Sequence, residues 1–134
     1  MSSRPNCLTF KTKTVIFTQD RVNEFCRCVN DLNPIHRPDY PNPTVPGMLT
    51  TALLFEDLVN HADPNFTDWT RLALIDIKFR DVVLVGKETV YEYHTVFFRA
   101  RHRKFKVLVK QDEKICVEAE YLVVKKDPFE EDRR

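Results

Sequence analysis

The spacing of apolar and polar residues changes several times along the chain, and each change marks a predicted element. Apolar residues alternate loosely over Leu8–Phe17, which predicts a strand. Thr18-Gln19-Asp20 follows as a helix-start signal, with Asp20 in the first turn. The next apolar residues recur at helical spacing and predict a half-buried helix that ends near Asn30-Asp31: Val22, Phe25, Cys26 and Val29.

The middle of the chain predicts a stiff loop and then a second helix of a different kind. Asn33–Pro46 contains five prolines and no apolar period, which is typical of an irregular loop. Gly47–Asn60 returns to helical spacing, but it is apolar on nearly every side until Glu56-Asp57. A helix that is apolar all round is buried all round, so we expect this helix to form the core.

After a polar stretch the spacing changes to period two. It predicts four strands, the last two forming an antiparallel hairpin around a turn at Gln111–Lys114: Leu72–Phe79, Glu88–Phe98, Phe105–Lys110 and Ile115–Val124. This order favours an α+β domain in which a curled antiparallel sheet wraps around the apolar helix. The alternative is a cystatin-like arrangement, with the helix lying on an open sheet. We assign residues 1–126 to this single domain and 127–134 to a charged, flexible tail.

Composition narrows the function classes. A chain of 134 residues fits one domain, and a net charge of +1 creates no global field toward nucleic acid or lipid. No apolar run approaches the ~20 residues of a membrane helix. The four cysteines are unevenly placed with no signal segment before them, so we read them as small apolar residues in a reducing compartment. We expect a cytoplasmic protein, with an organelle matrix as the other option, and no metal site.

One segment combines titratable side chains with a rigid backbone. Asp31 and His36 stand five residues apart on a proline-containing loop directly before the apolar helix. Asn33 can fold its side chain onto the backbone, and Pro34 fixes a dihedral angle, so the loop can hold both groups in one geometry. Gly47 opens the helix, where free N–H groups and the positive end of the dipole are found and where a ligand can approach closely.

These segments resemble the MaoC-like hot-dog family, which includes the (R)-specific enoyl-CoA hydratases and the type 2 hydroxyacyl-thioester dehydratases. The motif Asp-x-Asn-Pro-Ile-His lies over Asp31–His36, and Val-Pro-Gly-Met-Leu lies over Val45–Leu49. Phe79–Lys87 is similar to the family turn F-x-x-P-V-x-x-G-D, with a valine and a lysine in place of the usual proline and aspartate. The only two glycines of the chain, Gly47 and Gly86, both fall where the family pattern has one.

The resemblance implies a hot-dog fold and a reversible syn hydration of a trans-2-enoyl thioester to an (R)-3-hydroxyacyl thioester. Asp31 and His36 match the family's catalytic pair, which activates one water. The N–H of Gly47 matches the donor to the thioester oxygen. Asn33 would support the site by shaping the loop. Thr50 or Thr51 would support it from within the helix.

The resemblance also implies the partners. Coenzyme A or an acyl-carrier protein would arrive with the substrate, and no metal or redox cofactor would be needed. Hot-dog subunits usually pair edge to edge with the substrate tunnel between them, which implies a homodimer or a higher hot-dog oligomer.

The chain departs from the family pattern in the loop. The connection Pro41–Pro46 is compressed, and Pro46 stands where the family often has a histidine. Two alternatives stay open, and these departures support the first of them, whereas the Asp-x-Asn-Pro-Ile-His pattern argues against the second. One is a non-catalytic acyl-thioester binder or structural partner subunit of hot-dog fold. The other is an acyl-CoA thioesterase, which uses the same fold.

A run of basic residues starts at the end of the strand predicted at 88–98: Arg99, Arg101, Arg103, Lys104, Lys106 and Lys110. It is either a solvated turn or a surface for the phosphates of coenzyme A or an acidic carrier protein. In the second interpretation Arg101, Arg103 and Lys104 bind the phosphates. No pattern for reading nucleic acid accompanies the run, so no nucleic-acid partner is expected.

Overall fold

The computed structural model describes residues 9–60, 70–99 and 102–125. Its helices are α1 (Gln19–Val29), the short 3-10 helix η1 (Pro34–His36) and α2 (Gly47–Asn60). Its strands are β1 (Thr9–Ile16), β2 (Thr44–Val45), β3 (Thr70–Phe79), β4 (Val83–Leu84), β5 (Glu88–Arg99), β6 (His102–Gln111) and β7 (Lys114–Lys125).

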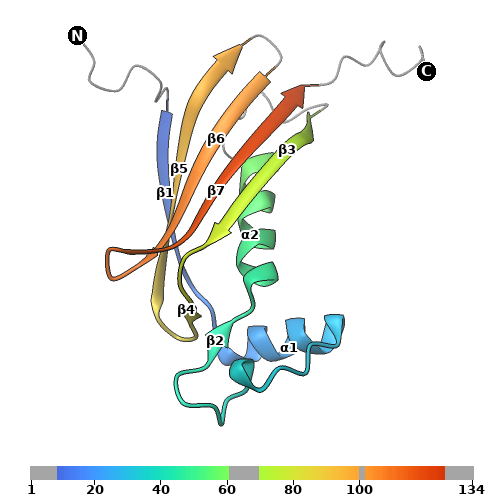
Figure 1. The fold of residues 1–134 in the computed structure, drawn as a ribbon, viewed down its shortest axis with the longest axis vertical. Helices are drawn as coiled ribbons and strands as arrows, with labels where there is room; N and C mark the ends of the chain where they lie inside the picture. The colour runs from blue at the N-terminus through green and yellow to red at the C-terminus, as the bar shows by residue number, and fades with distance from the viewer. Residues whose placement is uncertain (1–8, 61–69, 100–101, 126–134) are drawn as a thin grey trace.

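One long antiparallel sheet forms the body of the fold, in the strand order β1-β5-β6-β7-β3. The sheet curls, and α2 runs along its inner side, while α1 and the small β2–β4 sheet lie at one end (Figure 1). This is the predicted curled sheet around a central helix rather than the cystatin-like alternative. The strands β1 and β3 are the two edges of the described sheet.

The local signals at the first helix act as predicted. Thr18 is the N-cap of α1, and its side chain accepts a hydrogen bond from the backbone N–H of Arg21 (3.2 Å). Asn30 ends the helix in the left-handed conformation, with φ of 57°. The predicted hairpin is also confirmed, because Asp112 and Glu113 form a tight turn with positive φ between β6 and β7.

The central helix differs from the prediction in one respect. Its inner side is buried among the strands, with Leu49, Leu53 and Leu54 in the core. Met48, however, is 71% exposed, and Ala52, one turn later, is exposed as well. The helix is apolar on a side that this chain alone leaves uncovered, so the expectation of burial on every side was wrong for the single chain.

The cysteines occupy different environments. Cys116 is buried, Cys26 is half-buried and Cys28 is exposed, and all three are free thiols. The interpretation as small apolar residues fits the buried Cys116, whereas Cys28 lies at the surface. Cys7 and the predicted tail at 127–134 lie outside the described residues. Within the described part of the chain, no helix has the length and apolar character needed to cross a membrane.

Candidate active site

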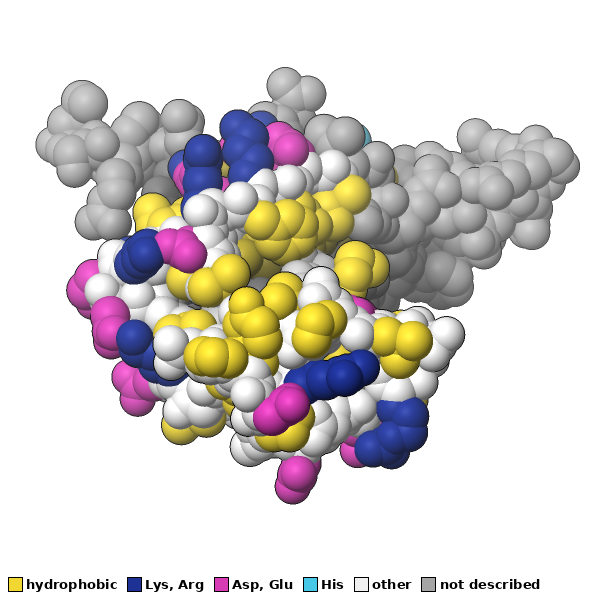
Figure 2. Space-filling model, turned by 60° about the horizontal axis from the view of Figure 1, so that its bottom comes forward, with side chains coloured by type: hydrophobic (Ala, Val, Ile, Leu, Met, Phe, Trp, Pro, Cys, Tyr) yellow, Lys and Arg dark blue, Asp and Glu magenta, His cyan; other side chains and the backbone are white. Residues whose placement is uncertain are grey.

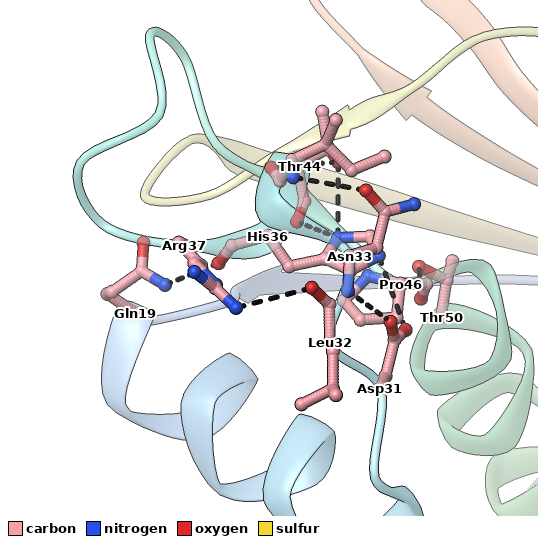
Figure 3. Close-up of polar contacts among 10 residues, drawn as sticks. Gln19, Asp31, Leu32, Asn33, His36, Arg37, Thr44, Pro46 and Thr50 are labelled. Atoms are coloured by element: carbon pink, nitrogen blue, oxygen red, sulfur yellow. Dashed lines mark hydrogen bonds and ion pairs between the residues drawn. The ribbon is translucent and has the colours of Figure 1, made fainter.

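The structure brings Asp31 and His36 into contact. Oδ2 of Asp31 lies 3.4 Å from Nε2 of His36, and both side chains are largely buried, at 30% and 11% exposure. The other ring nitrogen, Nδ1, lies 2.8 Å from the carbonyl oxygen of Thr44. A carbonyl oxygen only accepts hydrogen bonds, so Nδ1 carries a hydrogen and donates a hydrogen bond to this oxygen. Nε2 is left facing the carboxylate, and the ring sits between Thr44 and Asp31 (Figure 3).

The loop between α1 and β2 is organised by side-chain to backbone hydrogen bonds. Asn33 is the N-cap of η1, and its Oδ1 accepts from the N–H of Ile35 (3.3 Å). The N–H of Asn33 in turn donates to Oδ1 of Asp31 (3.0 Å), which fixes the carboxylate. These contacts agree with the loop-shaping role expected of Asn33.

A tether from α1 holds the backbone at His36. Nε2 of Gln19 donates to the carbonyl oxygen of His36 (2.8 Å) and to Oδ1 of Asn23 (2.9 Å). His36 is thus held at its carbonyl by Gln19, at Nδ1 by Thr44 and at Nε2 by Asp31. Sequence reasoning missed Gln19 and Thr44 as site residues, since each lies eight or more positions from His36.

Gly47 begins α2 beside this loop. The carbonyl of Pro46 accepts from the N–H groups of Leu49 (3.0 Å) and Thr50 (3.2 Å), so Pro46 stands just before the first helical turn. The N–H groups of Gly47 and Met48 donate to no acceptor in the described part of the chain. They are the free donors at the positive end of the helix dipole.

The two threonines expected to support the site behave differently. Thr50 is fully buried, lies against the same cavity as Gly47, and its hydroxyl donates to the carbonyl of Pro46 (3.4 Å). The hydroxyl of Thr51 turns back to the carbonyl oxygens of Gly47 (3.1 Å) and Met48 (3.2 Å), away from that cavity. The structure therefore places Thr50, but not Thr51, at the site.

An open groove of about 510 Å³ runs past His36 and Gly47. Most of its lining is apolar and comes from β2, α2, the end of β3, the connection to β4, β4 itself and β7: Val45, Met48, Phe79, Val82, Val83 and Val117. Figure 2 looks at this end of the molecule and shows hydrophobic side chains gathered at its centre, with charged side chains around them. A groove of this chemistry can bind an alkyl chain.

A second cavity of about 330 Å³ lies on the other side of His36. Asp31 lines this cavity and not the groove, whereas His36 lines both. Most of the other lining side chains are amides or guanidinium groups: Asn23, Arg27, Asn30, Asn33 and Arg37. His36 therefore lines both a mostly apolar groove and a second cavity whose surface is about half polar.

Two ion pairs border the groove where β3 ends. Nε of Arg80 lies 2.5 Å from Oε2 of Glu118, and this hydrogen bond lowers the pKa of the glutamate. The ammonium of Lys114 binds Asp81, and that hydrogen bond lowers the pKa of Asp81 and raises the pKa of Lys114. Both pairs therefore persist at neutral pH.

The structure does not gather the predicted phosphate-binding residues near this site. Arg103 is only 6% exposed and points to the core side of β6, and Lys104 on the opposite face pairs with Glu120 (3.6 Å). Lys110 likewise pairs with Glu92 (3.0 Å). Arg101 lies outside the described residues.

Position along β6 also keeps these basic residues away from the site. Gln111, whose side chain binds the backbone of β4, lies at the site end of β6. Arg103 lies eight residues away along the strand, roughly 26 Å. The start of β6, to which Arg103 belongs, lies at the end of the sheet opposite α1 (Figure 1).

Comparison with known proteins gives structural matches only. No protein-family model matches the chain, and no curated protein sequence matches it. The fold is similar to an (R)-hydratase from A. caviae involved in PHA biosynthesis, with a TM-score of 0.77 and 18% identity over 90% of this chain and 96% of that one.

Two further structures show the range of activities on this fold. The C-terminally truncated HadBC (3R-hydroxyacyl-ACP dehydratase) complex from Mycobacterium tuberculosis matches with a TM-score of 0.68 and 15% identity, over 92% of this chain and 100% of that one. An acyl-CoA hydrolase from Staphylococcus aureus matches with a TM-score of 0.64 and 14% identity, over 90% of this chain and 65% of that one. The predicted hot-dog fold is confirmed, and identities this low establish the fold alone.

Proposed function

We propose that the protein is a MaoC-like hydratase or dehydratase that interconverts trans-2-enoyl and (R)-3-hydroxyacyl thioesters. The observation that carries the proposal is the contact between Asp31 and His36 next to the free N–H of Gly47. Two groups able to move protons thus stand beside a donor for a developing oxyanion. The hydratase and dehydratase among the structural matches support the same reaction class.

The proposed chemistry balances without a cofactor. In hydration, Asp31 and His36 hold one water, and one of the two takes a proton as the water oxygen bonds to C3. Charge moves to the thioester oxygen, where the Gly47 N–H and the α2 dipole stabilise it. The pair then returns a proton to C2, so no net proton is taken up or lost. Dehydration is the reverse sequence.

The two cavities fit the two reactants of this reaction. The apolar groove suits the acyl chain, and the second cavity, which Asp31 and several amide side chains line, suits water. His36 lines both cavities and would meet both reactants. Coenzyme A or an acyl-carrier protein would enter as part of the substrate.

The first test is a direct assay with crotonyl-CoA, in which loss of the enoyl absorbance measures hydration. A thiol reagent in parallel reports free coenzyme A, which hydrolysis releases and hydration does not. We expect absorbance loss without thiol release, and an (R)-3-hydroxybutyryl product by chiral chromatography. Thiol release would assign the protein to the thioesterases, and binding of butyryl-CoA without turnover would assign it to the non-catalytic binders.

We also propose that the protein is a homodimer, because a single chain leaves apolar surface around the groove. Met48, Phe79 and Val82 are all more than half exposed, and Ile75 on the edge strand β3 is exposed as well. A second copy paired along β3 would cover these side chains and satisfy the strand's outer backbone groups. Light scattering after size exclusion should give the mass of two chains, and Ile75→Lys should shift it to one. A single-chain mass in the unaltered protein would refute this proposal.

A further inference from the structure

Phe79 stands against the start of α2. It is the last residue of β3 and lies opposite the buried Val117, on the strand face that meets the helix. A Cβ placed on Gly47 would lie 2.8 Å from Cε1 and 3.2 Å from Cζ of the Phe79 ring. The ring is therefore in contact with the glycine backbone, and the glycine leaves it the necessary room.

The ring also stands in the groove. Phe79 lines the cavity together with His36, Gly47 and Thr50, and 57% of its surface is exposed to it and to solvent. Any acyl group whose carbonyl reaches the Gly47 N–H must share the groove with this ring. The ring thus takes space that a larger acyl group would need.

The backbone that carries the ring is fixed. The N–H groups of Arg80 and Asp81 both donate to the carbonyl oxygen of Cys116, at 2.8 and 3.1 Å. Their side chains pair with Glu118 and Lys114 on β7. These contacts hold the backbone that follows Phe79, so the ring makes room most readily by rotation of its own side chain.

We propose that Phe79 determines the acyl-group size that the groove accepts and restricts it to short acyl thioesters. This inference rests on the proposed function for its substrate class. Its mechanism is steric, because the ring fills apolar volume next to the carbonyl-binding donor. Additional methylenes each change selectivity by roughly 10-fold or more in an apolar site, so removal of the ring should produce a large change in preference.

The test compares trans-2-butenoyl-CoA with trans-2-octenoyl-CoA. In the unaltered protein we expect a higher kcat/KM for the four-carbon substrate. Phe79→Ala should raise the ratio of eight-carbon to four-carbon kcat/KM by at least ~10-fold, and Phe79→Leu should give an intermediate value. Ile16→Ala is the matched control, since it removes an exposed apolar side chain from the end of the other edge strand, β1, outside both the groove and the proposed dimer face.

Binding of the unreactive butyryl-CoA and octanoyl-CoA, measured by calorimetry on the same four proteins, separates this inference from the proposed reaction. A shift of binding preference in Phe79→Ala supports the role of Phe79 even if no protein turns over its substrate. An unchanged preference in both turnover and binding overturns it. Absence of binding to every protein overturns it as well, because the groove would then take no acyl thioester.

Discussion

Replacing His36 with glutamine is expected to lower the rate of crotonyl-CoA hydration by roughly 10²–10⁴-fold, the range for a lost general acid or base. Glutamine places its amide near the position of Nε2, where it can still bind Asp31, but it cannot exchange a proton at neutral pH. His36→Ala should lose at least as much activity. It should also lose stability, because the buried Thr44 carbonyl would lack its donor.

The matched control is His94→Gln. His94 is also a largely buried histidine beside a carboxylate, with Nε2 3.7 Å from Oε1 of Glu92, but it lies on β5 and lines neither cavity. We expect its hydration rate to match that of the unaltered protein. Rates close to normal in His36→Gln would remove His36 from the mechanism.

A double variant tests whether the two groups act together. Asp31→Asn keeps an oxygen that can accept from the N–H of Asn33 but removes the charge next to His36. Residues that act as a unit show non-additive losses, so Asp31→Asn with His36→Gln should be about as slow as the slower single variant. Losses that multiply would indicate two independent roles.

Much of this site could be predicted because its signals are local. Pro46-Gly47 marks the start of α2, and the helix begins at Gly47, as predicted. The proline and the asparagine of the loop fold Asp31 and His36 toward each other through short-range hydrogen bonds. Short-range interactions of this kind can be predicted from a segment of five or six residues.

The basic run shows what could not be predicted. Neighbours in a strand point to opposite faces, so Arg103 turns inward and Lys104 outward although they are adjacent in sequence. The carboxylates that neutralise the outward lysines, Glu92 and Glu120, come from the flanking strands β5 and β7. Strand pairing therefore decides the charge of that surface. Gln19, Thr44 and Phe79 could not be predicted as site residues either, because their contacts with the site depend on tertiary packing.

The second large effect is expected from removing the N–H of Gly47, and the design has to separate this N–H from the contact with Phe79. Any side chain at position 47 meets the Phe79 ring at 2.8 Å, so a single substitution would change both. Phe79→Ala therefore serves as the background. Within it, Gly47→Ala adds a Cβ and keeps the N–H, while Gly47→Pro adds a similar bulk and removes the N–H.

The helix should tolerate both changes, because proline is well accepted at the first helical position and the Gly47 N–H has no acceptor in the described chain. Removing one oxyanion donor typically lowers kcat by 10²–10³-fold. We therefore expect Phe79→Ala/Gly47→Pro to hydrate crotonyl-CoA at least ~100-fold more slowly than Phe79→Ala/Gly47→Ala, with similar circular dichroism spectra and similar affinities for butyryl-CoA. Equal rates in the two double variants would mean that the thioester oxygen takes its hydrogen bond elsewhere. The adjacent free N–H of Met48 would then be the nearest remaining donor.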